Sequence, residues 1–247
     1  FLGGDARSPY RFLHVPGIDL HHRGRRRAAV AGRQDRRTQP DCQRHDDGRN
    51  EMRLKIVQAG EPVLRQAARP LTKEEILGDD IQRLIADMRE TMRDAPGVGL
   101  AAPQVGLSLQ LAVVEDREEY LRDLRPEQSA EKERRPVPFH AIVNPAIAPA
   151  EDTEVEFHEG CLSVAGFVAV VPRFRRVRVE CLDQTGEPRV IEASGWYARI
   201  LQHEIDHLRG TLYLDRMVSR TFTTTGNFSR HWKNKSIEEV RRELKAE

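Results

Sequence analysis

The stretch LQHEIDHLRG, residues 201–210, places two histidines four positions apart, with a glutamate directly after the first. Residues i and i+4 lie on the same face of a helix, so His203 and His207 can direct both imidazoles at one ion. An H-E-x-x-H pattern on a helix is typical of hydrolytic metal sites in which the glutamate, here Glu204, is the general base. The same letters also fit a surface helix with two histidines and two acids, so the rest of the chain has to decide.

The residues before the motif indicate that this helix has one buried face. That face recurs at spacings of four, three and four, and its members are Trp196, Ile200, His203 and His207. The histidines therefore belong to the inward side, which weakens the surface-helix interpretation. Ser194 is placed to cap the start of the helix, and Gly210 stands where a helix stops.

Short β patterns surround a few helical segments along the chain. They are bounded by Pro, Gly or acidic residues and comprise 109–114, 141–145, 167–171, 176–182 and 189–193. Capping boxes open an amphipathic helix at Thr72 and a C-terminal helix over residues 236–246. Because strands and helices do not alternate regularly, we predict an α+β fold with mostly antiparallel strands around a central helix that carries the H-E-x-x-H motif.

The overall composition excludes several classes of protein. The 247 residues are enough for one domain with an appendage, and 40 basic against 39 acidic residues leave a net charge of +1. This balance gives no global field toward nucleic acid or an anionic membrane. No run approaches the roughly 18 apolar residues of a membrane span, and three cysteines do not make a secreted disulfide framework. We therefore expect a cytoplasmic protein that requires neither nucleic acid nor a membrane.

Two segments differ from the rest in composition. Residues 1–51 are rich in arginine, contain no lysine and lack apolar periodicity, whereas patterned sequence begins at Met52. We expect residues 1–51 to be disordered, or to be upstream sequence before a natural start at Met52, with a targeting peptide or a nucleic-acid-binding arm as alternatives. The catalytic domain then spans residues 52–247. Within it, residues 115–137 are almost wholly charged or turn-forming and predict a solvated insertion.

A catalytic metal site needs a third protein ligand besides the two histidines. The sequence after the motif, LRGTLYLD, lacks the third histidine of metzincins, and nothing singles out the first downstream glutamates, Glu238 and Glu239. Cys161 in EGCLS (159–163) is the best candidate, because thiolates bind divalent transition metals strongly and the glycine before it lets backbone approach closely. A buried cysteine that only packs is the alternative.

Three segments together resemble the peptide deformylases. GVGLAAPQ (97–104), EGCLS (159–163) and QHEIDH (202–207) match, in this order, the three signature motifs of that family. The similarity runs from Met52 to about residue 215. It implies a metal-dependent hydrolase that removes the N-formyl group from N-formylmethionine of newly synthesised polypeptides, by metal-activated water.

The resemblance also implies the metal chemistry. The ligands would be Cys161, His203 and His207, which leaves a fourth position for water. In the family the metal is typically Fe²⁺, and Zn²⁺, Ni²⁺ or Co²⁺ can occupy the site; the ligand types do not choose between them. Glu204 would take a proton from the water and pass it to the leaving amine.

Further roles follow from the same resemblance. Gln104 and the backbone of Leu162 would donate hydrogen bonds to the oxyanion, and Glu159 would pair with Arg173 to hold the cysteine loop. The expected substrate-binding residues are Gly97, Val98, Gly99, Trp196 and Ile200. The expected partners are N-formylmethionyl nascent peptides, with the ribosome as a further contact.

Two other functions stay open at the level of sequence. One is an H-E-x-x-H metallopeptidase that cuts internal peptide bonds. The other is a non-catalytic zinc module in which Cys181 completes a closed Cys/His site. The zinc module would hold its metal with four protein ligands, whereas a hydrolase leaves one position for water.

Overall fold

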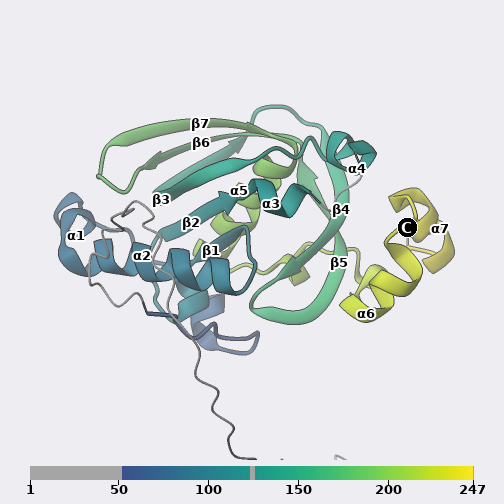
Figure 1. Ribbon diagram of the computed structural model, residues 1–247, viewed down its shortest axis with the longest axis horizontal. Helices are drawn as coiled ribbons and strands as arrows, with labels where there is room; N and C mark the ends of the chain where they lie inside the picture. Colours follow the sequence, from purple (N-terminus) through teal and green to yellow (C-terminus); the bar gives the residue numbers. More distant parts are fainter. Residues whose placement is uncertain (1–51, 123–125, 247) are drawn as a thin grey trace, which may run out of the picture. The chain divides into compact units, whose positions relative to one another are not determined.

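Two antiparallel sheets and a long helix, α5 (Gly195–Leu208), organise the part of the chain that the structure describes (Figure 1). The structure is a computed structural model, and it describes residues 52–122 and 126–246. The predictions made for residues 1–51 lie outside the described residues. The combination of helices with antiparallel strands confirms the predicted α+β class.

The strands pair with their neighbours in antiparallel fashion throughout both sheets. The larger sheet has the order β1-β2-β3-β6-β7, and the smaller sheet has the order β4-β5-β8. The strands are β1 (Gly99–Ala101), β2 (Leu111–Asp116), β3 (Val137–Pro149), β4 (Glu154–Cys161), β5 (Val164–Phe174), β6 (Arg176–Leu182), β7 (Pro188–Ser194) and β8 (Thr223–Thr224).

Helices connect and flank these strands. The α-helices besides α5 are α1 (Lys73–Leu77), α2 (Asp79–Asp94), α3 (Glu118–Leu121), α4 (Pro126–Glu131), α6 (Thr225–Asn227) and α7 (Ile237–Leu244). Short turns of other helix types are η1 (Pro62–Arg65), η2 (Ala102–Val105), η3 (Tyr213–Asp215), η4 (Ser219–Thr221) and η5 (Phe228–Trp232). None of the helices in the described ranges has the length and apolar character needed to cross a bilayer.

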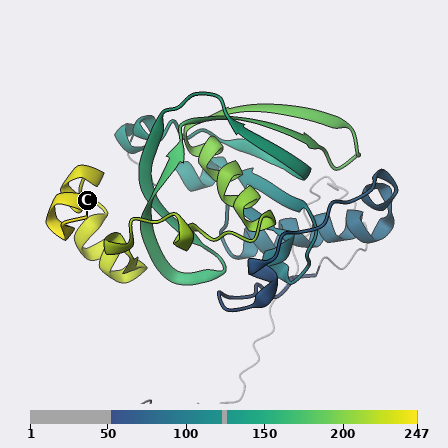
Figure 2. The same cartoon turned by 180° about the vertical axis from the view of Figure 1, so that it is seen from behind.

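The larger sheet is covered on both faces, and successive buried side chains of β2 point to opposite faces. Ala112 and Val114 pack in a core with Leu201 and Ile205 of α5, whereas the intervening residues of β2 pack in a second core with the methionines of α2. Figures 1 and 2 show α2 and α5 on opposite sides of this sheet. A strand that is buried on both faces reads as a continuous apolar run, which is why LQLAVV predicts a strand.

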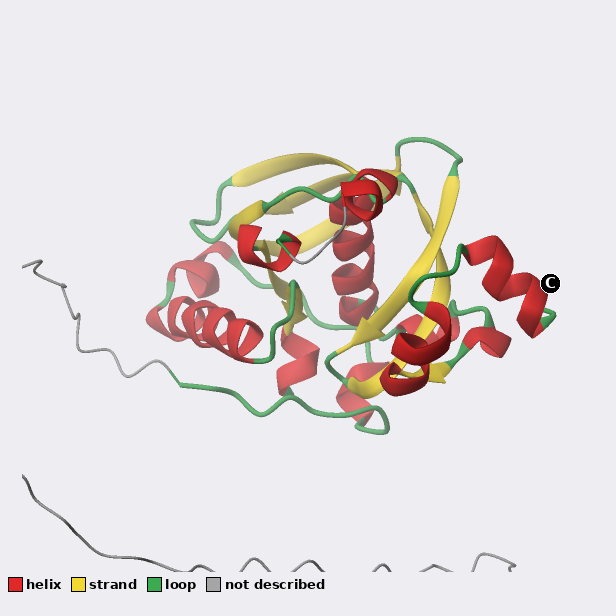
Figure 3. Ribbon diagram, turned by 45° about the vertical axis from the view of Figure 1, so that its right-hand side comes forward, coloured by secondary structure: helices red, strands yellow, loops and turns green. Residues whose placement is uncertain are grey.

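Helix α5 contacts strands of both sheets. Figure 3 shows it between the larger sheet and the long β4–β5 hairpin of the smaller one. Ser194 precedes the helix as predicted, but its side chain makes no capping hydrogen bond. Residues from both sheets can therefore meet side chains on different faces of the same helix.

The charged stretch 115–137, predicted as a solvated insertion, begins inside the larger sheet, whereas its described residues from 117 to 136 are exposed or half-buried. Strand β2 continues through Glu115 and Asp116, and both side chains are buried. Arg93 donates two hydrogen bonds of 2.8 Å to Glu115, and Arg134 donates two of 2.8 Å to Asp116. These pairings make burial of the two carboxylates tolerable, and a count of charged residues cannot reveal them.

The C-terminal part of the chain packs against the smaller sheet. Strand β8 pairs with β5, and Arg241 of α7 donates a 2.7 Å hydrogen bond to Glu156 of β4. Ser236 and Glu239 form the predicted capping box at the start of α7.

At the other end of the domain, the helix expected from Thr72 is interrupted at Gly78, so that α1 and α2 are separate. Strand β4 is not among the strands that the sequence patterns predict, although Val155 and Phe157 alternate with polar residues.

Gly195, at the start of α5, offers a test of how tightly the charged stretch is docked. Its φ is +57°, and an added Cβ would lie 2.4 Å from the Cβ of Glu133 and 2.6 Å from the carbonyl oxygen of Lys132. Gly106 also has a positive φ, +86°, but has nothing within 4 Å of such a Cβ. We expect Gly106→Ala to cost about 1–2 kcal/mol of unfolding free energy from backbone strain, and Gly195→Ala to cost about 1–3 kcal/mol more from the clash. Urea denaturation measures both, and equal losses would contradict the docking.

Candidate metal and catalytic site

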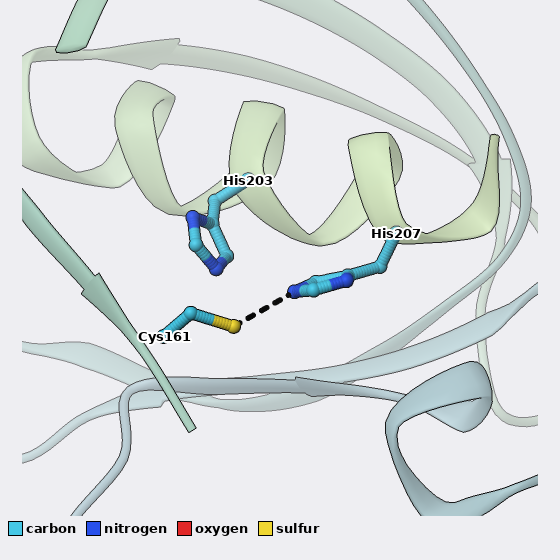
Figure 4. Close-up of side chains that lie close together, drawn as sticks. All are labelled: Cys161, His203 and His207. Atoms are coloured by element: carbon cyan, nitrogen blue, oxygen red, sulfur yellow. Dashed lines mark hydrogen bonds between the residues drawn. The ribbon is translucent and has the colours of Figure 1, made fainter. Parts of the chain in front are cut away.

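Three side chains from two distant segments meet at the middle of the domain. Cys161 is the last residue of β4, and His203 and His207 lie on α5 (Figure 4). One ligand atom from each lies within 4.8 Å of the others, and the three could hold a metal ion. Cys161 Sγ is 3.2 Å from His207 Nε2, and the two imidazole centroids are 5.0 Å apart. A thiolate with two imidazoles suits Zn²⁺, Fe²⁺, Ni²⁺ or Co²⁺ rather than Mg²⁺ or Ca²⁺.

The loop that presents Cys161 is held by backbone contacts. The register of the β4–β5 hairpin shifts between Gly160 and Cys161, which turns the thiol out of the regular ladder. Gln58 donates a 3.0 Å hydrogen bond from its side chain to the carbonyl of Leu162, and Ala59 donates a 2.7 Å backbone hydrogen bond to Ser163. The first described residues of the chain therefore brace the cysteine loop from outside the sheet.

Glu159 is the buried anion that orients this site. Arg173 of β5 donates two hydrogen bonds of 3.0 Å to its carboxylate, and Arg199 of α5 donates one of 2.6 Å. His203 Nδ1 lies 3.1 Å from the same carboxylate, which can only accept, so Nδ1 carries the proton and Nε2 keeps a free lone pair. Burial acts to raise the pKa of Glu159, but the charge of Arg173 and the bonds from His203 and Arg173 hold it well below its usual range.

A second acid extends the same network along α5. Arg173 donates a 2.5 Å hydrogen bond to Asp206, and Arg216 donates two more, of 2.6 and 2.8 Å. One guanidinium thus joins a carboxylate of β4 to a carboxylate of α5. Because Glu159 and Asp206 are both buried, their charges depend on these arginines.

Glu204 is buried, and its carboxylate stands apart from the ion pairs. Its Oε2 has no hydrogen-bond partner among the described residues. Burial raises the pKa of Glu204 to about 7, and the negative charge of Glu159 acts in the same direction. A Cβ added to Gly99 of β1 would lie 2.2 Å from Glu204 Oε1, so only glycine at that position leaves room for the carboxylate.

A cavity of about 300 Å³ opens in front of these groups. Cys161, His203 and Glu204 contribute to its lining. So do all five predicted substrate-binding residues, Gly97, Val98, Gly99, Trp196 and Ile200. Arg173 is not part of this wall but lies behind Glu159.

The two predicted oxyanion donors also line this cavity. The side-chain carbonyl of Gln104 accepts a 2.8 Å hydrogen bond from the backbone N–H of Ala101. Its amide nitrogen is consequently the end near the thiol, 3.5 Å from Cys161 Sγ. Leu162 follows the thiol directly, so its backbone N–H belongs to the same loop.

Other candidates from the sequence lie elsewhere. Cys181 belongs to β6 and packs in the core under α5, and it is absent from the cluster of possible metal ligands found among the described residues. Burial raises the pKa of its thiol. Glu238 and Glu239 lie in the first turn of α7 and are absent from that cluster as well. The closed Cys/His site that includes Cys181 is therefore not formed in the described part of the chain.

Three residues near the site were missed by sequence reasoning. Arg199 is four residues before His203 on the inward face, and a buried arginine there signals a carboxylate partner. Asp206 is the second of the two unspecified positions of H-E-x-x-H, so the motif alone assigns it no role. Tyr213 is buried, and its ring stacks on His203 with centroids 6.3 Å apart, a contact that no local pattern encodes.

Comparison with known proteins identifies the class. The family model described as polypeptide deformylase matches residues 53–222, and the chain belongs to this family. It is 48% identical over 172 residues to peptide deformylase 1A, chloroplastic, of Solanum lycopersicum, a match that covers 70% of this chain and 62% of that protein. It is 45% identical over 168 residues to the mitochondrial peptide deformylase of Homo sapiens, covering 68% of this chain and 69% of that protein. The chain spans less than two thirds of the tomato relative's length.

A solved structure has the same fold. It is the class I type b peptide deformylase from Acinetobacter baumannii with Met-Ala-Ser bound, at a TM-score of 0.60 and 31% identity. The match covers 68% of this chain and 99% of that one. The combination of helices and antiparallel sheet that the strand and helix patterns predict is therefore shared with this family.

The charge balance around Glu159 is directly testable. Glu159→Gln leaves Arg173 and Arg199 buried without their shared carboxylate, so we expect a loss of about 3–5 kcal/mol in the free energy of unfolding. Glu192→Gln is the matched control, because Glu192 forms an exposed ion pair with Arg178 at 2.7 Å and should cost about 1 kcal/mol or less. Chemical denaturation of both variants, at equal metal content, gives the comparison. Similar losses would show that the buried network is not a stabilising contact.

Proposed function

We propose that this chain is a metal-dependent peptide deformylase that removes the N-formyl group from N-formylmethionyl nascent polypeptides. The observation that carries the proposal is the meeting of Cys161, His203 and His207 beside Glu204, whose Oε2 has no hydrogen-bond partner among the described residues, with Cys161, His203 and Glu204 lining one cavity. Membership of the deformylase family supports the same reaction. In this proposal α5 is the central helix of the fold and carries the H-E-x-x-H motif.

The donor set fits one divalent metal. Cys161, His203 and His207 would hold it, and the Nδ1–Glu159 hydrogen bond presents His203 in the tautomer that a metal ligand requires. We propose Fe²⁺ as the native ion, with Zn²⁺, Ni²⁺ or Co²⁺ as substitutes. A bound divalent ion supplies Lewis acidity and lowers the pKa of water from 15.7 to roughly 7.

The protein groups then have distinct tasks. Glu204 accepts a proton from the attacking water, and the water oxygen forms the new bond to the formyl carbon. The amide Nε2 of Gln104 and the backbone N–H of Leu162 donate to the oxygen that gains negative charge. When the C–N bond breaks, Glu204 returns the proton to the amine nitrogen, so that formate and a free N-terminus leave.

The cavity suits an apolar first side chain. Val98, Trp196 and Ile200 contribute apolar wall, and Gly97 and Gly99 line the same cavity. The relative from Acinetobacter baumannii binds Met-Ala-Ser, a peptide that begins with methionine. We infer that the methionine of the substrate occupies this pocket in our chain.

The proposed partners are nascent peptides, with the ribosome as a further contact and no nucleic acid or membrane required for the reaction. We place the protein in the cytoplasm, where such chains are made. The tomato relative is named as chloroplastic and the human relative as mitochondrial. Both names refer to compartments that have their own translation. Cell fractionation of the native host decides the compartment.

Deformylation of formyl-Met-Ala-Ser by the purified full chain tests the function. Formate release and metal content are measured on the same sample, and an N-acetylated peptide of the same length reports cleavage of internal bonds. We expect formate release without internal cleavage. Internal cleavage alone would instead support a metallopeptidase, and bound metal without either reaction would support a non-catalytic zinc module.

Glu204→Gln should separate chemistry from metal binding. We expect kcat to fall by roughly 10²–10⁴-fold while one metal per chain is retained, because the amide cannot act as a base and the three proposed ligands remain. Glu192→Gln, which changes an exposed glutamate in the same way, should leave both quantities unchanged. Loss of metal from Glu204→Gln would mean that Glu204 is a ligand.

The choice between the two cysteines described by the structure is also testable. Cys161→Ala removes a proposed ligand, and we expect metal content to fall well below one per chain together with formate release. Cys181→Ala changes the buried cysteine of β6 and should retain the metal. The measurement is elemental analysis after equal dialysis. Retained metal in Cys161→Ala, or lost metal in Cys181→Ala, would contradict the proposed ligand set.

A further inference from the structure

The indole of Trp196 is a wall of the cavity, and it is contacted by cations from the charged stretch between β2 and β3. Trp196 is in the first turn of α5 and contributes to the cavity lining. Lys132 Nζ lies 4.8 Å from the centroid of this ring, and Arg134 Cζ lies 5.2 Å from it. Both distances are within the range in which a cation is attracted to an aromatic face.

The segment that carries these cations is docked on the start of α5. The backbone N–H of Trp196 donates a 2.8 Å hydrogen bond to the carbonyl of Lys132. Arg175, between β5 and β6, pairs with Glu133, and Arg134 is fixed by its two hydrogen bonds to the buried Asp116. Each residue of this tripeptide therefore has its own link to the rest of the domain, so the two cations have defined positions.

The Lys132 ammonium has unusual surroundings. In the described part of the chain no carboxylate pairs with it, and its contacts are the rings of Trp196 and Phe157, the latter with its centroid 5.6 Å away. Burial, and then the charge of Arg134, hold the pKa of Lys132 below its usual range. No ion pair among the described residues accounts for the position of this ammonium. We therefore attribute its position to the attraction between its charge and the two aromatic faces.

We propose that Lys132 is a positioning residue for substrate selection: held on the Trp196 indole, it fixes the ring as the wall that limits the size of the first side chain. This inference rests on the proposed function, and it assigns the charged stretch a role in that site. Arg134 makes the second contact, but its pair with Asp116 also serves the fold. Lys132 is therefore the residue whose role can be isolated.

The kinetic test compares formyl-Met-Ala-Ser with formyl-Phe-Ala-Ser, which has a bulkier first side chain. In Lys132→Met we expect the ratio of kcat/KM for the two peptides to fall about two- to fivefold, through KM rather than kcat, because a looser ring admits the larger side chain. Lys132→Arg keeps a cation on the ring and should restore the ratio. Lys235→Met is the matched control, since Lys235 Nζ lies 4.8 Å from the ring of the distant Trp232.

A second readout does not depend on activity. In a Trp232→Phe background Trp196 is the only indole of the chain, so fluorescence quenching by acrylamide reports on that ring. We expect faster quenching in Lys132→Met than in the parent, and parent-like quenching in Lys132→Arg. Melting temperatures identify a variant that fails to fold, in which case Lys132→Gln replaces Lys132→Met.

The outcomes separate the two proposals. An unchanged peptide ratio or unchanged quenching in the folded charge-removing variant overturns the role of Lys132, and so does failure of Lys132→Arg to rescue. A parent protein that releases no formate overturns the proposed function, and the quenching experiment then still decides whether Lys132 holds the ring. A change of the peptide ratio in Lys235→Met would overturn the assignment, because the effect would not be local.

Discussion

Glu159 lies where the β4–β5 hairpin meets α5, and its carboxylate accepts hydrogen bonds from Arg173, Arg199 and His203. One buried anion thus connects β4 and β5, the two strands of the hairpin, to α5, the helix that carries both proposed histidine ligands. Without it, the buried guanidinium of Arg199 would lose its counter-charge, and Arg173 would keep only Asp206. Cys161 follows two residues further along β4.

The arrangement explains how a site with paired buried charges can also contain a carboxylate oxygen without a hydrogen-bond partner. The charges behind it are fully paired, through Glu159 and Asp206, so that the structure there has one low-energy arrangement. In front of them, Glu204 lines the cavity with its Oε2 unpaired among the described residues, and a glycine of β1 makes room for it. The proposed base is therefore held by a network to which it does not itself belong.

Much of the fold was predictable because its signals are local. The alternation of Val177 and Val179 with charged residues predicted β6, and the capping boxes predicted the starts of two helices. Strand β4 escaped notice because EVEFHEGC mixes charged and apolar residues with only one buried side chain. Residues of β4 pair with residues of β5, which follows after the hairpin turn. A pattern within β4 alone cannot reveal this pairing.

The sequence by itself determined the family and the candidate donors: the order of three short motifs selected a family, and the i, i+4 spacing of His203 and His207 placed two donors on one helix face. The tertiary structure alone decided which charges are buried and what neutralises them. Asp116, Lys132 and Arg199 look like surface residues in a linear reading, yet each is packed against a partner far along the chain. The physical reason is that a buried charge is tolerated only through its partner, and the partner is brought near by folding.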